Sequence, residues 1–78
     1  MFKYNVGDCV VATCWNNTRH YGIVTEVCVV ISKNFYCIAD RNCRLWFGEA
    51  RVEPATPPQQ HEIKLKASGN QVTNELPL

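Results

Sequence analysis

Five cysteines and two histidines are the residues of this chain best suited to covalent or metal chemistry. Structural zinc sites usually take their ligands in close pairs, and Cys9 and Cys14, with four residues between them, come nearest to that spacing. An odd number of positions separates the two, so a regular strand would send their side chains to opposite faces. His20 is expected on a loop and His61 on a linker, and no spacing pairs either with a cysteine as nucleophile and base. We therefore predict no metal, no cofactor and no catalytic residue, and expect reduced, buried thiols.

Aromatic and basic side chains suggest a second kind of chemistry, the stacking of unpaired bases combined with contacts to phosphate. The rings that could stack bases are Trp15, Tyr21 and Tyr36. The cations that could contact phosphate are Arg19, Lys33, Arg41 and Arg44. The formal net charge is only +1, so no strong positive field attracts phosphate from a distance. Single-stranded nucleic acid is therefore the alternative partner, and such binding should fall steeply as salt rises.

A third candidate feature is an exposed aromatic side chain that contacts a protein partner. Leu45, Trp46 and Phe47 are consecutive, and neighbouring residues of a strand face opposite sides. Either Leu45 and Phe47 are core while Trp46 points outward, or the reverse holds. Trp46 and Phe47 therefore mark a candidate partner surface.

The scaffold for these residues is expected in the first two-thirds of the chain. The 78 residues allow one domain, and all eight aromatic residues lie between Phe2 and Phe47. Runs rich in β-branched residues, separated by turn residues, predict five strands. They are expected at 9–14, 21–31, 35–39, 44–47 and 51–53, with a polar loop at 16–19 and a hairpin turn at 32–34. Gly22 is expected at a bend or bulge, where its missing side chain lets two backbones approach.

The composition changes after Pro54. Residues 55–61 are rich in proline, which predicts an extended linker. Residues 62–67 alternate polar and apolar side chains, which predicts one more edge strand that caps the sheet or pairs with a second copy in a homo-oligomer. Residues 68–78 predict a flexible tail. No stretch has a convincing 3.6-residue apolar period, so little helix is expected.

Three motifs and a closing strand indicate a known kind of fold. Gly7–Ala12 begins with Gly-Asp, Tyr21–Val24 reads Tyr-Gly-Ile-Val, and Phe35–Asp40 is followed later by Val52–Pro54. Residues 5–54 thereby resemble the Tudor and related SH3-like barrel families, including KOW-type modules. The resemblance implies an all-β domain over residues 1–54, a five-stranded SH3-like barrel.

In Tudor domains, rings at one end of the barrel form a cage for a methylated cation. The resemblance implies a ligand-binding end formed by Trp15, Tyr21, Tyr36 and Asp40. Such cages usually include a further ring, and here Arg41 and its neighbours occupy that place, so the implied cage is open on one side. The other interpretation is that Trp15 and Tyr21 cover the end of the barrel and shield its core.

The barrel also resembles the small plasmid-borne dihydrofolate reductases, which build an active pore from four identical subunits. Their catalytic strand carries Val-Gln-Ile-Tyr where this chain has Arg44–Phe47, so the glutamine and tyrosine that hold the ligands are absent. The leading hypothesis is therefore a non-catalytic module that binds a protein or peptide. It would suit an accessory protein of a phage, plasmid or other mobile element, and equally a piece of a larger regulator. No apolar run could span a bilayer and no secretory signal is present, so we expect a cytoplasmic location and no membrane partner.

Overall fold

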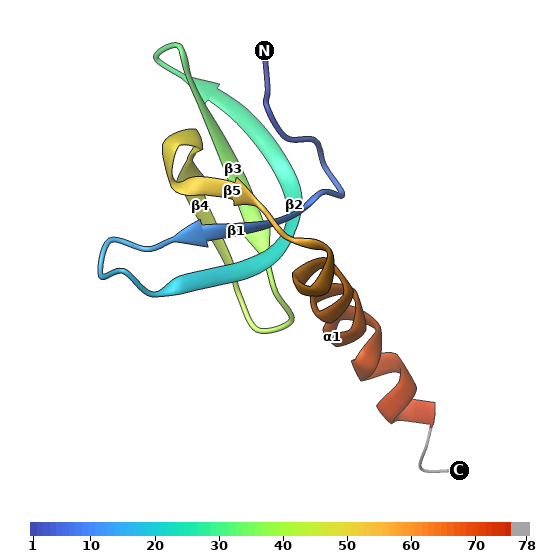
Figure 1. Cartoon of the computed structure of the whole chain (residues 1–78). Coiled ribbons are helices and arrows are strands. Elements are labelled where there is room, and N and C mark those ends of the chain that lie inside the picture. The colour runs from blue at the N-terminus through green and yellow to red at the C-terminus, as the bar shows by residue number, and fades with distance from the viewer. Residues whose placement is uncertain (76–78) are drawn as a thin grey trace.

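The structure is a computed structural model that describes residues 1–75. Its elements are β1 (Cys9–Thr13), β2 (Arg19–Val30), β3 (Lys33–Ala39), β4 (Arg44–Gly48), a 3-10 turn (Glu49–Arg51), β5 (Val52–Pro54) and α1 (Pro57–Glu75). The strands form one antiparallel sheet in the order β4-β3-β2-β1-β5 (Figure 1). All five predicted strands are confirmed, each to within two residues at either end. The sheet is not closed, since β4 and β5 each pair with a single strand, so the structure confirms a five-stranded antiparallel sheet but not the expected barrel.

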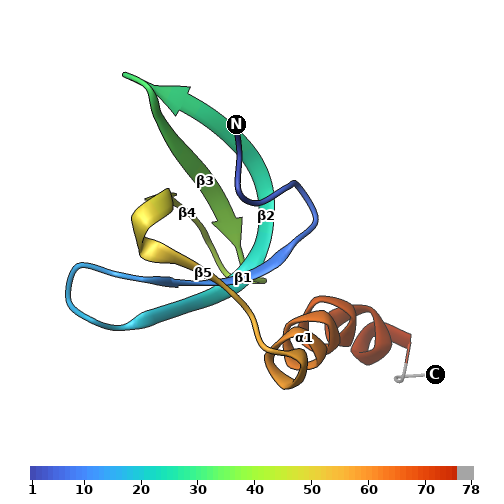
Figure 2. The ribbon, with the colours of Figure 1, turned by 45° about the horizontal axis from the view of Figure 1, so that its top comes forward.

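Strand β2 is the longest strand, and its curvature wraps the sheet around the core (Figure 2). A β-bulge interrupts its pairing with β3, because Val24 pairs with Ile38 and Glu26 with Cys37, which leaves Thr25 as the extra residue. Before the bulge, His20 and Val24 point inward and are buried, whereas after it the partly buried Val27 packs against the core. An extra residue exchanges the two faces of a strand, since side chains alternate with a period of two.

Gly22 allows the close approach of backbones that was predicted for it. A Cβ atom built at this position would lie 2.3 Å from the carbonyl oxygen of Ala39, the last residue of β3. No side chain fits at that separation without displacing β3. Gly22 therefore lets the start of β2 cross tightly against the end of β3.

The hairpin between β2 and β3 turns at Ile31 and Ser32, one position earlier than predicted. Lys33 already pairs with Val30, so it belongs to the strand. Both turn residues have positive φ, 50° for Ile31 and 64° for Ser32. Two central residues in this conformation form a type I′ turn, whose twist matches that of the flanking strands.

The core is built from side chains of all five strands together with the N-terminal segment. Tyr36, Ile38, Val10 and Val24 are the largest fully buried side chains. Tyr4 packs edge to face against Tyr36, with ring centroids 5.3 Å apart, and its hydroxyl donates to the carbonyl of Val52 at 3.0 Å. The chain before β1 is therefore an integral part of the packed fold.

The edge strand predicted over residues 62–67 is wrong, because Pro57–Glu75 form α1. Residues 57–61 of the predicted linker 55–61 and residues 68–75 of the predicted tail 68–78 also lie in this helix, while residues 76–78 lie outside the described residues. The Thr56 and Gln59 side chains form a capping box: the Gln59 amide N–H donates to Thr56 Oγ1, and Gln59 Oε1 accepts from the Thr56 amide at 2.9 Å. Pro57 occupies the first helical position, where its missing N–H has no cost.

The first turns of helix α1 contact the sheet, and the rest of the helix projects away from it (Figure 1). Ile63 is its buried side chain among the residues for which burial is described, and Gln60 Nε2 donates to the carbonyl of Ala55 at 2.9 Å. No helix in residues 1–75 is both long and apolar enough to cross a membrane. The predicted homo-oligomer required residues 62–67 to form an edge strand, and these residues are helical instead.

Candidate functional site

Trp15 and Trp46, placed in two different candidate sites by the sequence, line the same groove. Trp15 lies in the loop between β1 and β2, and Trp46 lies in β4. The groove has a volume of about 480 Å³ and is also lined by Leu45, Phe47 and Arg51. Trp15 is 86% exposed and Trp46 is 48% exposed. Two large indole rings are therefore open to solvent on one concavity.

The loop that carries Trp15 is held by its own hydrogen bonds. The Cys14 amide donates to the Thr18 carbonyl at 2.7 Å, and the Asn17 amide donates to the Cys14 carbonyl at 2.9 Å. Asn16 Oδ1 accepts from both the amide and the hydroxyl of Thr18, at 3.2 and 2.7 Å. The expectation that polar side chains here bond to local backbone is confirmed. The loop therefore presents Trp15 in a defined position.

Strand β4 supplies the other wall of the groove and is an edge strand. It pairs with β3 along one side, and no strand of residues 1–75 pairs with the other. Phe47 is only 8% exposed and packs in the core, whereas Trp46 and Leu45 are both exposed. Of the two residues predicted for a partner surface, Trp46 is exposed, whereas Phe47 is not available at the surface because it pairs with Tyr36 on the inward face.

The cage of Trp15, Tyr21, Tyr36 and Asp40 is not assembled. Tyr36 is fully buried, and its hydroxyl donates to the Glu49 carboxylate and accepts from the Lys3 amide at 2.9 Å. Burial and the hydrogen bond to Glu49 raise the pKa of Tyr36. Tyr21 and Asp40 line a separate pocket that does not include Trp15. Tyr36 was misplaced because its inward face of β3 could not be told from the outward one.

The predicted phosphate contacts are dispersed. Arg19 and Arg41 line the same pocket as Tyr21, together with Lys66 of α1. Arg44 lies 3.9 Å from the exposed carboxylate of Glu26. Lys33 is the first residue of β3 and lies beside the hairpin turn, at the end of the strand away from Arg41. The four cations therefore do not share one pocket, and none of them lines the groove of Trp15 and Trp46.

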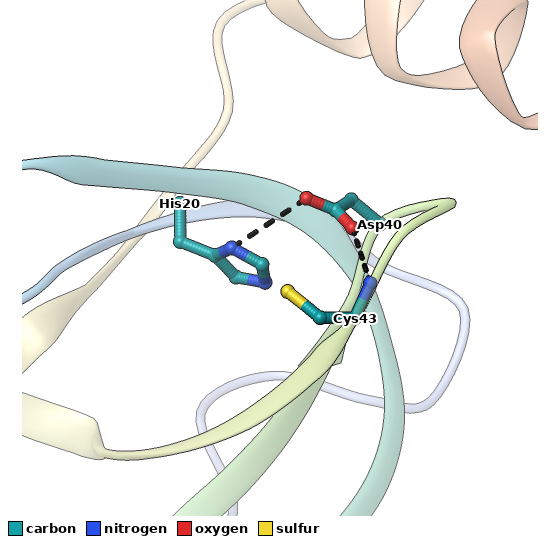
Figure 3. A group of neighbouring side chains, drawn as sticks. All are labelled: His20, Asp40 and Cys43. Atoms are coloured by element: carbon teal, nitrogen blue, oxygen red, sulfur yellow. Dashed lines mark hydrogen bonds and ion pairs between the residues drawn. The ribbon is translucent and has the colours of Figure 1, made fainter.

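The pocket that contains Tyr21 has a volume of about 900 Å³ and lies where the start of β2, the end of β3 and α1 meet. His20 and Asp40 line this pocket on its strand side, and Cys43 lies next to them; Figure 3 shows the three side chains directed toward one another. His20 lies within β2 and is 8% exposed, so its predicted place on a loop is wrong. It is also beside a cysteine, a pairing that no sequence spacing indicated.

Each partner in this cluster is held by further hydrogen bonds. His20 Nε2 lies 2.9 Å from the Ile38 carbonyl oxygen, and Nδ1 lies 3.7 Å from Asp40 Oδ2. Asp40 Oδ1 accepts from the amides of Asn42 and Cys43 at 2.7 and 2.8 Å. Burial would raise the pKa of Asp40, but these amide hydrogen bonds and the nearby His20 outweigh it and lower the pKa. Asp40 is therefore a fixed carboxylate at neutral pH.

Cys43 does not have the surroundings of a reactive thiolate. Desolvation, followed by the negative charge of Asp40, raises the pKa of its thiol. A cysteine nucleophile needs a lowered pKa, which positive neighbours provide. The cluster of His20, Asp40 and Cys43 thus has the residue types of a nucleophile and base but the wrong electrostatics for that chemistry.

Comparison of the chain with protein-family models, with curated proteins and with solved structures finds no match to any of the three.

Proposed function

We propose that this chain is a small non-catalytic interaction module that binds an extended peptide segment of a partner protein in the groove between Trp15 and Trp46. The observation that carries the proposal is the presence of two solvent-exposed indoles on one concave surface. Tryptophan is over-represented among the residues that dominate binding energy, because one ring buries a large area with little loss of freedom. Isolated exposed apolar residues are common, but two indoles lining one groove are not.

The chemistry of the groove favours an extended peptide. Its β4 wall is an unpaired strand edge, and a bound segment could add to it by main-chain hydrogen bonds. The indoles would then hold an apolar side chain of that segment. Arg51 is the charged residue that lines the groove, so an acidic neighbour in the peptide would complete the contact.

The five-stranded meander, in which β5 returns to pair with β1, supports the SH3-like assignment as part of the same proposal. A methylated cation is not the proposed ligand, because Tyr36 is buried and the rings of the implied cage do not converge. Single-stranded nucleic acid is an outcome of the test below rather than a second proposal, since the cations lie apart from the two indoles.

The test uses the two indole N–H signals as reporters, since the chain has only two tryptophans. Peptides selected from a random library against the immobilised chain would be titrated and followed by NMR. Both indole signals should shift together, and Trp15→Ala or Trp46→Ala should each weaken binding by about 30-fold, the equivalent of roughly 2 kcal/mol. Both variants should remain folded, because neither side chain is buried.

Tyr21→Ala is the matched control, because Tyr21 is an exposed aromatic residue that lines the other pocket. It should bind the selected peptides like the wild type. The proposal fails if the tryptophan variants bind with unchanged affinity or if peptides shift signals around Tyr21 instead. Binding of an unstructured oligothymidylate that collapses as salt rises would favour the nucleic-acid alternative.

A further inference from the structure

The cluster of His20, Asp40 and Cys43 presents three different donor atoms to one point. A ring nitrogen of His20, a carboxylate oxygen of Asp40 and Cys43 Sγ all lie within 4.8 Å of one another. They come from β2 and from the two ends of the turn between β3 and β4 (Figure 3). The groove proposed for peptide binding does not include any of the three residues.

The hydrogen bonds around the cluster orient its donor atoms. A carbonyl oxygen can only accept, so His20 Nε2 donates its hydrogen to Ile38, and Nδ1 is the ring nitrogen that faces Asp40. Histidines that bind metals usually donate their other N–H to a backbone carbonyl or carboxylate in this way. Asp40 has one oxygen held by two amides and the other facing His20. Two of the three donors are therefore positioned by the fold.

We propose that His20 Nδ1, Asp40 Oδ2 and Cys43 Sγ bind a zinc ion, with a fourth position open to the neighbouring pocket. Zinc accepts nitrogen, oxygen and sulfur ligands, whereas calcium and magnesium require oxygen alone. Bond lengths of about 2.0–2.3 Å in a tetrahedron place donor atoms roughly 3.3–3.7 Å apart. The observed 3.7 Å between Nδ1 and Oδ2 already lies near that range. Cys43 is exposed, so a side-chain rotation can complete the approach.

Binding releases the proton of the Cys43 thiol to the buffer as the zinc–sulfur bond forms. Asp40 binds as the carboxylate that it already is, and His20 binds through Nδ1 without a proton on that nitrogen. Zinc supplies the positive charge that the thiolate lacks in the metal-free site. With three protein ligands, the fourth position is left for water or for an incoming donor atom, as in zinc sites of the open kind.

The test uses the metal-free, reduced full chain and the ions Zn²⁺ and Co²⁺ alone. We expect one ion per chain by calorimetry, and a Co²⁺ complex with a thiolate charge-transfer band and the intense visible bands of four-coordinate geometry. Cys43→Ser should abolish the charge-transfer band and weaken zinc binding at least 100-fold, and Asp40→Asn should weaken it by at least 10-fold. Both residues are exposed, so folding should be retained, which circular dichroism would verify.

Cys28→Ser is the matched control, because Cys28 lies eight residues along β2 from His20, about 26 Å in an extended strand. It should bind zinc like the wild type, and zinc should raise the melting temperature of both but not that of Cys43→Ser. The proposal is overturned if the wild type does not bind zinc at submillimolar concentrations. The proposal would also be overturned if Cys43→Ser bound zinc as tightly as the wild type, or if Cys28→Ser lost as much zinc affinity as Cys43→Ser.

Discussion

Replacing Gly22 by alanine should weaken the fold where β2 passes closest to the end of β3. The added Cβ would lie 2.3 Å from the Ala39 carbonyl oxygen and 2.8 Å from its carbon, whereas ordinary contacts begin at 3.4 Å. The obstacle is backbone, so a change of rotamer cannot relieve the clash and the strands must separate by about 1 Å. Overpacking of this kind costs about 1–3 kcal/mol. The reduced freedom of the unfolded chain offsets about 0.4–1 kcal/mol, which leaves a net loss of roughly 1–2 kcal/mol.

Gly48→Ala provides the matched control on β4. The nearest atom to a Cβ at that position is Phe35 Cε2 at 3.6 Å, an ordinary contact, and the backbone is extended with φ −70° and ψ 153°. Only the effect on the unfolded chain remains, so this variant should be more stable than the wild type by about 0.4–1 kcal/mol.

Urea unfolding followed by circular dichroism and tryptophan fluorescence would measure both variants. In thermal unfolding of a domain of this size, Gly22→Ala should lower the melting temperature by about 4–16 °C, while Gly48→Ala should raise it by a few degrees. The packing described for the β2–β3 crossing would be refuted if Gly22→Ala unfolded within 0.5 kcal/mol of the wild type. It would equally be refuted if the two glycine variants changed stability by the same amount.

Three further predictions concern the core and the helix. Tyr36→Phe removes the hydroxyl shared with Glu49 and the Lys3 amide, and should cost about 1–3 kcal/mol in urea unfolding; a change below 0.5 kcal/mol would contradict the network. The pKa values of Tyr4 and Tyr36 are raised above 10.0, chiefly because both side chains are buried. The stability that the two protonated hydroxyls contribute is therefore complete below about pH 10 and is lost as pH rises through the folded-state pKa values. Urea midpoints should therefore fall above about pH 10, and a flat profile up to pH 11.5 would count against this. Ile63→Ala should destabilise the chain by more than 1 kcal/mol, because Ile63 is the buried contact of α1, whereas Leu65→Ala, at a position 55% exposed, should stay within 0.5 kcal/mol in the same assay.

The strands could be predicted because their evidence is local. Runs such as Cys9–Thr13 combine β-branched residues with turn residues at both ends. Gly22 lacks the side chain that would prevent two backbones from crossing closely. The choice between the faces of Leu45–Phe47 could not be made in advance. The structure buries Phe47 and exposes both Trp46 and Leu45, because β4 is an edge strand and its outer part is not covered.

The helix was missed because its buried face is small. Among residues 57–66 only Ile63 is buried, so no apolar stripe repeats every 3.6 residues, and the alternation from Glu62 to Ala67 imitates a strand. The sequence Thr56-Pro57-Pro58-Gln59 did contain the evidence needed, since a threonine followed three residues later by glutamine, with proline between them, is typical of a helix start.

Contacts between distant segments were beyond sequence reasoning. His20 meets Asp40 and Cys43 only because β2 and β3 pair in one register, which no local spacing encodes. The same holds for the groove, where the loop that carries Trp15 meets Trp46 across the folded sheet. Tyr36 was assigned to a binding end because its face of β3 was unknown until its pairing with Phe47 was seen.

The single extra residue at Thr25 makes the length of β2 critical for the pocket that His20 and Tyr21 line. Deleting one residue there would remove the offset between the two halves of the strand and rotate residues 19–24 by half a turn relative to the rest. His20 would then face solvent, and Tyr21 would be forced toward the core. Insertions and deletions in this strand should therefore be far less tolerated than those in the surface loops, even though Thr25 itself is not one of the proposed zinc ligands.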